Sequence, residues 1–598
     1  MNVTTESLQA ATPGAVPTPT TIGKEIELKR FETITDALDF AALAGTGVNF
    51  YDLKGGLASS ATYADVRDQA QVLAQRLAAR FDRGDRIAIV AETSMDFVVL
   101  FFACQYAGML PAPMPLPVNL GGKEGYLIQV RQMVTGADAR AALCPPALKP
   151  FIEEATADCD NVAVIDFEEA RALPVNGRAA IPFGPGEDCY IQYSSGSTSA
   201  PKGVVGTQQS VTSNLHAITK HGLKLTQHDR AVSWLPLYHD MGLIGFVLSP
   251  MFGQRSVDYI ATSDFVRRPL LWWRVLTANK ATITYSPSFG YDLSSKRAAR
   301  AQAGDLDLST LRIAGIGGDM VRPDALNAFT EAFKDFGFKK DAFVPSYGLA
   351  ESTLAIAFTE IDAPLTVDAV DMRLYDRTGV AQPAGSLTAP EQRREFVLCG
   401  AALPGHAIEI RENGEAIKED RRVGRVFIKG PSLTRGYYSD EAASEAMFDG
   451  DWLDTGDMGY LLNGQLVITG RAKDLIIING RNIWPQDIEW AVEKIEGVRQ
   501  GGVAAFSVDT GDGERIIVVA ERRGMADSAI TALRREVASV IQSTVGAPAE
   551  IVLTRPHTMV ITSSGKLSRA KVKAKYLSGA LTDAKATADQ EPLAEARV

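Results

Sequence analysis

Short β-rich runs alternate with helical patterns over most of the chain, and this alternation constrains the fold more than any other feature. The runs lie at 86–90, 188–193, 231–235, 281–285, 311–316 and 342–345. Strands separated by helices predict an α/β fold whose sheets are largely parallel. In such folds the loops at the strand ends are the usual place for binding sites.

The pattern changes twice toward the C-terminus, and these changes predict the domain organisation. From residue 396 the strands become denser, at 396–399, 425–429 and 465–469, which indicates a β-rich subdomain that completes the large domain. Beyond a boundary near 471–474, helices at 485–495 and 528–545 alternate with strands at 502–507, 516–521 and 550–554, which indicates a small α+β domain. We therefore predict a lead-in at 1–25, a large domain at 26–471, a C-terminal domain at 472–576 and a tail at 577–598. The composition of the lead-in and tail is typical of disorder.

Charge and cysteine usage exclude several classes of protein. The 598 residues include 61 Lys and Arg against 72 Asp and Glu, a balance that argues against nucleic-acid binding. The five cysteines are scattered without metal-ligand spacing, so neither a disulfide framework nor a zinc site is indicated. No basic start followed by an apolar run opens the chain. We expect a cytoplasmic protein.

One nearly uncharged stretch, at 97–118, is long enough to raise the question of a membrane span. Gln105 and prolines at 111, 113, 115 and 117 interrupt it. Prolines at this density are incompatible with one continuous spanning helix. We predict a buried helix followed by a proline-rich strand, and no integral membrane span.

The strongest local motif directly follows the apolar run at 188–193 and reads Tyr193-Ser194-Ser195-Gly196-Ser197-Thr198-Ser199-Ala200-Pro201-Lys202-Gly203. Glycine lets the backbone approach an oxyanion closely, hydroxyls supply neutral donors, and Lys202 adds positive charge. The spacing is not that of a Walker A loop. A flexible Ser/Gly linker is the alternative, but linkers seldom follow a core strand directly.

The loop resembles the one shared by acyl-CoA synthetases, luciferases and the adenylation domains of peptide synthetases, which form acyl-adenylates. The resemblance implies that ATP and Mg²⁺ are the cofactors. It places the phosphates over Ser195, Gly196, Ser197, Thr198 and Lys202, with Thr198 also near the metal.

A second motif of this family follows at Tyr347-Gly348-Leu349-Ala350-Glu351-Ser352. An aromatic ring is a flat platform for adenine, and a carboxylate is a hard oxygen ligand suited to phosphate-bound magnesium. The resemblance assigns Tyr347, Gly348 and Ser352 to nucleotide binding and Glu351 to magnesium and catalysis. It also places Gly318 and Asp319 at the nucleotide.

Three more motifs appear in the family's order. Trp452-Leu453-Asp454-Thr455-Gly456-Asp457 ends in an acceptor-only carboxylate suited to the ribose hydroxyls, although Thr-Gly-Asp alone is a common turn. Gly470-Arg471-Ala472-Lys473-Asp474 resembles the inter-domain hinge, with Arg471 at the ribose or phosphate and Lys473 at the pivot of a mobile C-terminal domain. Thr562-Ser563-Ser564-Gly565-Lys566-Leu567-Ser568-Arg569 resembles the segment that carries the catalytic lysine, Lys566.

Within this superfamily the sequence looks most like fatty acyl-AMP ligases. The resemblance is carried by Trp234-Leu235-Pro236-Leu237-Tyr238-His239-Asp240-Met241-Gly242-Leu243-Ile244-Gly245 and by a long segment after Ser352. Part of that segment, at about 365–395, looks like the insertion that packs against the C-terminal domain and disfavours coenzyme A; an ornamental surface loop is the alternative. The resemblance implies a fatty acid as substrate and an acyl carrier protein or a polyketide synthase carrier domain as partner.

The acyl group needs a pocket, and five residues are candidates for its walls: Asp240, Met241, Gly242, Ser286 and Phe289. Ordinary core packing explains the apolar and small ones almost as well. His239 is interpreted as a catalytic-site residue that gates or positions the acyl group, because a carboxylate already attacks as an anion and needs no base.

Three other functions remain open at this point. An acyl-CoA synthetase would share the first half-reaction and differ only in its acceptor. A non-catalytic nucleotide- or acyl-binding protein is disfavoured by Lys566, Glu351 and Asp457. A free-standing peptide-synthetase adenylation domain lacks a visible anchor for an amino group.

Overall fold

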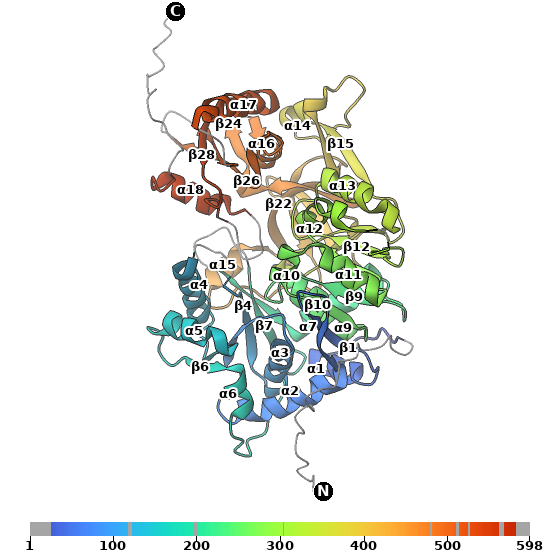
Figure 1. Ribbon diagram of the computed structural model, residues 1–598, viewed down its shortest axis with the longest axis vertical. Helices are drawn as coiled ribbons and strands as arrows, with labels where there is room; N and C mark the ends of the chain where they lie inside the picture. Colours follow the sequence, from blue (N-terminus) through green and yellow to red (C-terminus); the bar gives the residue numbers. More distant parts are fainter. Residues whose placement is uncertain are drawn as a thin grey trace, which may run out of the picture.

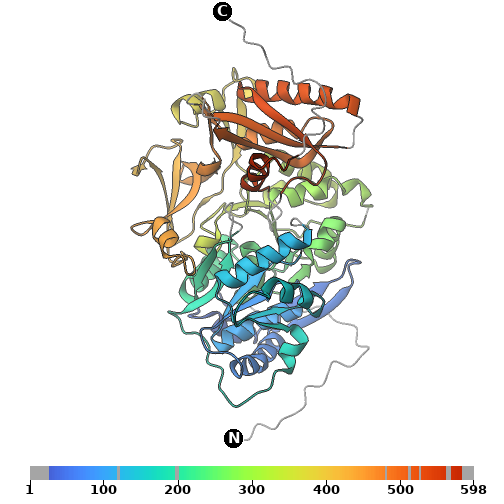
Figure 2. The same cartoon turned by 90° about the vertical axis from the view of Figure 1, so that its left-hand side faces the viewer.

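A computed structural model of the chain describes residues 26–117, 122–194, 201–302, 304–478, 481–509, 514–523, 527–560 and 567–581 (Figures 1 and 2). Five predicted site residues lie outside these ranges: Ser195, Gly196, Ser197, Thr198 and Lys566. The chain has the layered α/β architecture that the alternating strands and helices predict.

A nine-stranded sheet forms the centre of the large domain, in the order β17-β14-β13-β12-β11-β9-β10-β1-β2. The strands are β17 (Ala401–Ala402), β14 (Ala357–Phe358), β13 (Phe343–Tyr347), β12 (Ile313–Ile316), β11 (Ile283–Ser286), β9 (Ala231–Ser233), β10 (Val257–Ile260), β1 (Gly47–Tyr51) and β2 (Leu57–Thr62). The pairs from β13 across to β1 are parallel. Their carboxyl ends therefore meet at one edge, where a site is expected.

A second, four-stranded parallel sheet has the order β4-β3-β5-β6. Its strands are β4 (Leu110–Met114), β3 (Arg86–Val90), β5 (Ala141–Cys144) and β6 (Ala163–Asp166). Helix α3 (Met95–Ala107) precedes β4 and is buried at every residue from Phe97 to Ala107. Pro111 and Pro113 are tolerated because β4 is an edge strand of this sheet. The prediction of a buried helix followed by a proline-rich strand is confirmed.

In the part of the chain that the structure describes, no helix is long and apolar enough to cross a membrane.

Strands β7 (Asp188–Tyr193) and β8 (Gly203–Thr207) form an antiparallel hairpin that brackets the predicted phosphate loop. The hairpin is closed by the Ser194 N–H, which donates to the Lys202 carbonyl at 2.9 Å.

The β-rich subdomain is an antiparallel sheet in the order β19-β18-β20-β22-β21, with β23 also paired to β22. Its strands are β18 (Ala407–Glu412), β19 (Glu415–Ile417), β20 (Gly424–Lys429), β21 (Phe448–Asp449), β22 (Trp452–Leu462) and β23 (Gln465–Arg471). Strands β22 and β23 pair Asp457 with Arg471, two predicted nucleotide residues that are distant in sequence.

The C-terminal part has its own hydrophobic core, built from residues between Ile476 and Leu553. Its elements are β24 (Ile476–Ile478), β25 (Arg481–Ile483), α16 (Pro485–Val492), β26 (Val498–Asp509), β27 (Glu514–Arg522), α17 (Asp527–Val545), β28 (Ala549–Thr554) and α18 (Arg569–Leu577). It occupies the orange-to-red end of the molecule in Figures 1 and 2. The boundary at residue 471 stays a prediction.

The predicted insertion carries regular structure. Antiparallel strands β15 (Val367–Asp371) and β16 (Arg393–Val397) enclose helix α14 (Met372–Thr378) and a 3₁₀ turn, η8 (Pro390–Gln392). Helix α14 lies beside the C-terminal elements in Figures 1 and 2. Tyr375 of α14 and Trp484 of the C-terminal part share one hydrophobic cluster. The insertion is therefore physically joined to the C-terminal part.

Candidate active site

Two predicted nucleotide residues, Tyr347 and Asp457, contact each other directly. The Tyr347 hydroxyl donates to Asp457 Oδ2 at 2.7 Å, and Arg471 Nε lies 3.5 Å from Asp457 Oδ1. Burial and the charge of Asp457 hold the pKa of Tyr347 well above its ordinary value, so the phenol keeps its proton and donates. Residues of three motifs thus form one group, joined by a hydrogen bond and an ion pair.

Glu351 lies in a second group of side chains. Its Oε1 accepts a hydrogen bond from the Tyr437 hydroxyl at 2.9 Å. The Lys202 ammonium lies 4.5 Å from the centre of the Tyr437 ring and 4.0 Å from Asp440 Oδ2. The phosphate-loop lysine and the predicted magnesium ligand are therefore connected through Tyr437.

The ionisation of these groups is strongly perturbed. Burial raises the pKa of Glu351; the Tyr437 hydrogen bond opposes this rise, and the charge of Asp240 adds to it. Partial desolvation lowers the pKa of Arg471, although 52% of its side chain is exposed. The carboxylates of Asp457, Asp474 and Asp319 have a larger, opposite effect, so the pKa is raised. Perturbed groups gathered in this way are typical of functional sites.

The predicted hinge residue Lys473 lies in the same region, in the 3₁₀ turn η9 (Ala472–Asp474). Burial lowers its pKa, and the positive charge of Arg471 lowers it further. The carboxylates of Asp457 and Glu351 act on it in the opposite direction. The hinge turn is thus in electrostatic contact with both carboxylates of the site.

The donor set fits a magnesium ion that arrives with a nucleotide. Within the described ranges, no three His, Cys, Asp or Glu side chains gather where they could hold a metal. Mg²⁺ characteristically uses one or two carboxylates together with substrate phosphates and water. Glu351, with the Asp240 carboxylate close enough to raise its pKa, offers such a partial set of hard oxygen ligands.

The segment around Lys566 is fixed at its described ends. The Ser568 N–H donates to the Val560 carbonyl at 2.9 Å, which joins described residues on either side of Lys566. Arg569 binds Asp474 at 2.7 Å and Glu489 at 2.7 Å. The lysine-bearing segment is therefore tied to the hinge turn and to α16.

Two glycines and a serine of the motifs shape the backbone. A Cβ at Gly348 would lie 1.7 Å from the Leu354 carbonyl oxygen, so only glycine fits there. Gly318 has a φ of 77° and lies against Met241. Ser352 is fully buried and its hydroxyl donates to the Leu349 carbonyl at 2.9 Å. Its hydrogen bond closes the turn that presents Glu351, so its position indicates a structural role.

Asp319 is exposed and adds to the negative charge around Arg471.

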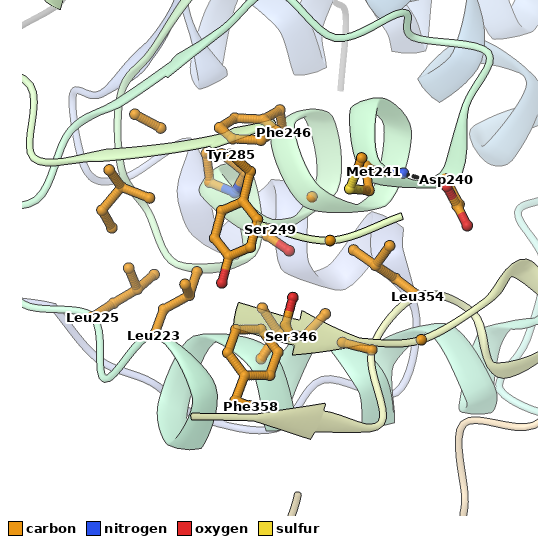
Figure 3. Close-up of a pocket in the computed structure, with 18 of the residues that line it drawn as sticks. Leu223, Leu225, Asp240, Met241, Phe246, Ser249, Tyr285, Ser346, Leu354 and Phe358 are labelled. Atoms are coloured by element: carbon orange, nitrogen blue, oxygen red, sulfur yellow. Dashed lines mark hydrogen bonds between the residues drawn. The ribbon is translucent and has the colours of Figure 1, made fainter. Parts of the chain in front are cut away.

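A cavity of about 70 Å³ lies beside the central sheet (Figure 3). Asp240, Met241, Gly317, Tyr347 and Gly348 line it at the carboxyl ends of the strands. Its walls are mostly apolar, and the remaining lining includes Leu223, Leu225, Phe246, Ser249, Ile283, Tyr285, Ser346, Leu354 and Phe358. At the amino ends of the strands it meets Asp229 and Arg230, which are paired with Arg312 and Asp258 at 2.6 Å each.

Three of the five predicted wall residues are not among the described residues that line this cavity, so their place in an acyl pocket stays a prediction. Ser286 follows the lining residue Tyr285 in β11, and successive strand residues point to opposite faces; its hydroxyl donates to the Pro287 carbonyl at 2.7 Å. Phe289 is 38% exposed and packs edge-on against Trp234. A Cβ at Gly242 would lie 2.0 Å from the Pro236 carbonyl oxygen, so this glycine serves backbone packing.

His239 lies beside the cavity entrance rather than along its wall. Its Nδ1 is 2.5 Å from Asp240 Oδ1, and Asp240 lines the cavity. The His-Asp pair therefore lies where the cavity meets the nucleotide-side groups.

No motif in the sequence indicates a role for Tyr437 or Asp440. Tyr437 reaches the site through an isolated β-bridge to Val204, next to the phosphate loop. No spacing or periodicity links residue 437 to residue 351, so only the folded chain brings them together.

Comparison with known proteins decides the family. A family model described as "AMP-binding enzyme" matches residues 44–438. The chain belongs to this family. A protein of Caulobacter vibrioides described as "Putative acyl-CoA synthetase" is 46% identical over 95% of this chain and 99% of its own length. The "Medium-chain-fatty-acid--[acyl-carrier-protein] ligase JamA" of Moorena producens is 29% identical over 92% of this chain and 96% of its own.

A solved structure from a study of fatty acyl-adenylate ligases from E. coli and L. pneumophila is 40% identical. It superposes with a TM-score of 0.88 and covers 93% of this chain and 99% of that one. Over the 93% of this chain that the match covers, this AMP-binding enzyme therefore has the adenylate-forming fold, as predicted.

Proposed function

We propose that this enzyme joins a fatty acid to AMP at the expense of ATP and then passes the acyl group to the phosphopantetheine thiol of a carrier protein or polyketide synthase carrier domain. One observation supports the proposal: strand β13 contributes to both the apolar cavity and the nucleotide-side group. Ser346 lines the apolar cavity, whereas the hydroxyl of the next residue, Tyr347, binds Asp457 of the nucleotide-side group. A carboxylate at the cavity mouth would meet a nucleotide held by that group.

The nucleotide would bind with its adenine against Tyr347 and its ribose on Asp457 and Arg471. Its phosphates would extend over the loop from Ser195 to Lys202. Mg²⁺, when bound with ATP, would neutralise phosphate charge, with Glu351 and Thr198 as its protein ligands. Glu351 would then be held ionised despite the burial that raises its pKa.

In the reaction, a carboxylate oxygen attacks the α-phosphorus while the bond to the bridging oxygen breaks and pyrophosphate leaves. No proton needs to be removed, because fatty carboxylates are ionised near neutral pH. The protein contributes in-line positioning and neutralisation of charge, with Lys566 between the carboxylate and the α-phosphate. His239 would gate the acyl group at the mouth of the cavity.

The choice of acceptor is supported by the junction between the insertion and the C-terminal part. Arg394 of β16 lies 2.7 Å from Asp487 of α16, and its guanidinium is 5.5 Å from the centre of the Trp490 ring. A C-terminal part held in this way would turn less readily about Lys473. The use of a large acceptor such as coenzyme A would require that turn, so the junction would disfavour coenzyme A. The names of relatives point both ways, to coenzyme A for the Caulobacter protein and to a carrier protein for JamA.

The test separates the two half-reactions. Acid-dependent exchange of pyrophosphate into ATP reports adenylation, and its absence with every fatty acid tried would refute the enzyme activity. With adenylate preformed, holo-carrier protein is expected to receive the acyl group much faster than coenzyme A. Rapid formation of acyl-CoA would instead favour an acyl-CoA synthetase.

A further inference from the structure

The apolar cavity contains hydroxyl groups that the fold itself does not satisfy. Among the described residues, the buried Tyr285 hydroxyl and the buried Ser249 hydroxyl have no hydrogen-bond partner. Both residues line the cavity, and Ser249 is only 1% exposed. A buried hydroxyl without a partner costs free energy, so such groups in a ligand cavity point to a polar atom of the ligand.

The two hydroxyls lie near a third. Figure 3 shows Tyr285, Ser249 and Ser346 with their oxygens around the same middle part of the cavity. Ser346 is close enough to lower the pKa of Tyr285 against the larger effect of burial, although the two hydroxyls do not meet at hydrogen-bonding geometry. Three hydroxyl groups, each able to donate and accept a hydrogen bond, thus lie around one part of an otherwise apolar cavity.

The position of Tyr285 is fixed by the sheet. Tyr285 is in register with Gly315 of β12, and a Cβ on Gly315 would lie 2.0 Å from the Tyr285 ring. The absence of a side chain at Gly315 therefore lets the ring lie across β12 toward Ser346 on β13. Gly315 precedes Gly317, a lining residue at the carboxyl end of β12, by two residues, or about 7 Å along a strand. The Tyr285 ring therefore crosses the sheet close to the carboxyl-end lining, which includes Tyr347 of the nucleotide-side group.

We infer that the cavity selects acids that carry a hydroxyl or keto oxygen on the part of the chain near the carboxylate, in preference to plain saturated acids. Such an oxygen would accept from or donate to Tyr285 and Ser249, while the remaining carbons occupy the apolar lining. The inference rests on the proposed adenylation and names the substrate class of the same site.

The experiment compares acids of one chain length that carry no substituent or a hydroxyl on the β-carbon, a mid-chain carbon or the terminal carbon. The readout is kcat/KM for acid-dependent pyrophosphate exchange. The wild type is expected to prefer a β- or mid-chain hydroxy acid over the plain acid by about three- to tenfold. Tyr285→Phe and Ser249→Ala are each expected to reduce this ratio toward one, because each should lower kcat/KM for the hydroxy acid more than for the plain acid.

Tyr126→Phe is the matched control, because the Tyr126 hydroxyl is also buried without a partner among the described residues but does not line the cavity. It should leave the ratio unchanged. A ratio of one or less in the wild type, as a niche filled only by water would give, overturns the inference. So does a preference confined to the terminal hydroxyl. If exchange with plain acids persists in these cases, the proposed function stands; if no acid supports exchange, both fail.

Discussion

Two groups of carboxylates, at the nucleotide side and at the insertion, are held in opposite ways. In the nucleotide-side group, Asp457 and Glu351 each accept a hydrogen bond from a phenol, at 2.7 and 2.9 Å. In the junction group, Asp487 is bound directly by the Arg394 guanidinium at 2.7 Å. Phenols orient a carboxylate without cancelling its charge, and the Arg471 guanidinium, 3.5 Å from Asp457, is half exposed to solvent, whereas the closer and largely buried Arg394 guanidinium neutralises Asp487. The first arrangement suits a ligand site, and the second suits a contact between two parts of the chain.

This difference predicts that changes at the nucleotide side affect chemistry and that changes at the junction affect domain movement. The largest effect should come from Lys566→Ala, because no other proposed group can bridge the carboxylate and the α-phosphate. Pyrophosphate exchange should fall about 100- to 1,000-fold, as for other groups that stabilise transition-state charge. Lys571→Ala, at an exposed position on α18, is the control. Exchange within a few-fold of wild type in Lys566→Ala would refute the catalytic assignment.

The next largest effect should follow the loss of charge at Asp457. Asp457→Asn keeps the shape but removes the anion that pairs with Arg471 and would accept from the ribose hydroxyls. The KM for ATP should rise about 10- to 100-fold, which is the cost of a lost hydrogen bond to a charged group. Steady-state exchange at varied ATP measures this.

Tyr347→Phe is a graded companion to that variant, because it retains the ring and loses only the hydrogen bond to Asp457. Its KM for ATP should rise less than in Asp457→Asn. An unchanged KM in both variants would show that the hydrogen-bonded group does not bind nucleotide.

Many individual residues of these two groups could be predicted from the sequence, but the contacts between them could not. Tyr347, Asp457 and Arg471 were each predicted from a local motif, whereas the hydrogen bond between Tyr347 and Asp457 spans 110 residues. Helix α3 and strand β4 were predictable because a long uncharged run and the prolines that interrupt it are local properties of the sequence. Tyr437 was missed because a β-bridge brings it to the site and no spacing records that bridge.

The residues that line this cavity could not be identified from the sequence for a simple physical reason. Ser286 is a predicted wall residue, but alternation along β11 places its neighbour Tyr285 in the lining of this cavity. The face of a short buried strand cannot be inferred when both faces are covered, because apolar residues then follow one another without a period. The unsatisfied hydroxyls of the cavity were invisible for the same reason.

At the junction, Arg394→Ala should release the C-terminal part from the insertion. Arg394 is 7% exposed at its side chain, and removing one partner of a largely buried ion pair leaves the other uncompensated. Proteolysis within the hinge at 472–475 should accelerate about tenfold, and acyl-CoA formation should increase from its low level. Arg393→Ala changes the exposed neighbour that faces Glu395 and should do neither. A slower rate of adenylation with no change in proteolysis would contradict this division of roles.

The smallest effect should come from Asp376 of α14, which lies at the same junction, near Asp487 and Arg394. Burial raises the pKa of Asp376 to about 7, and the charge of Asp487 adds to the rise, while Arg481 and Arg394 oppose it. Between about pH 4 and pH 7 the folded protein retains a proton that the unfolded chain has released, so this carboxyl reduces stability as pH rises and has its full cost above pH 7.

Asp376→Asn removes the titration while keeping the shape of the side chain. The melting temperature should therefore rise by about 1–3 °C at pH 8 and by less at pH 5. Hydrogen exchange of α14 and α16 should slow at pH 8 in the variant, because Asp487 no longer faces a second negative charge. Glu395→Gln alters an exposed carboxylate of the same segment and should show no such pH dependence. Equal shifts at both pH values would mean that the junction does not titrate at Asp376, and the contrast with the nucleotide side would then rest on Arg394 alone.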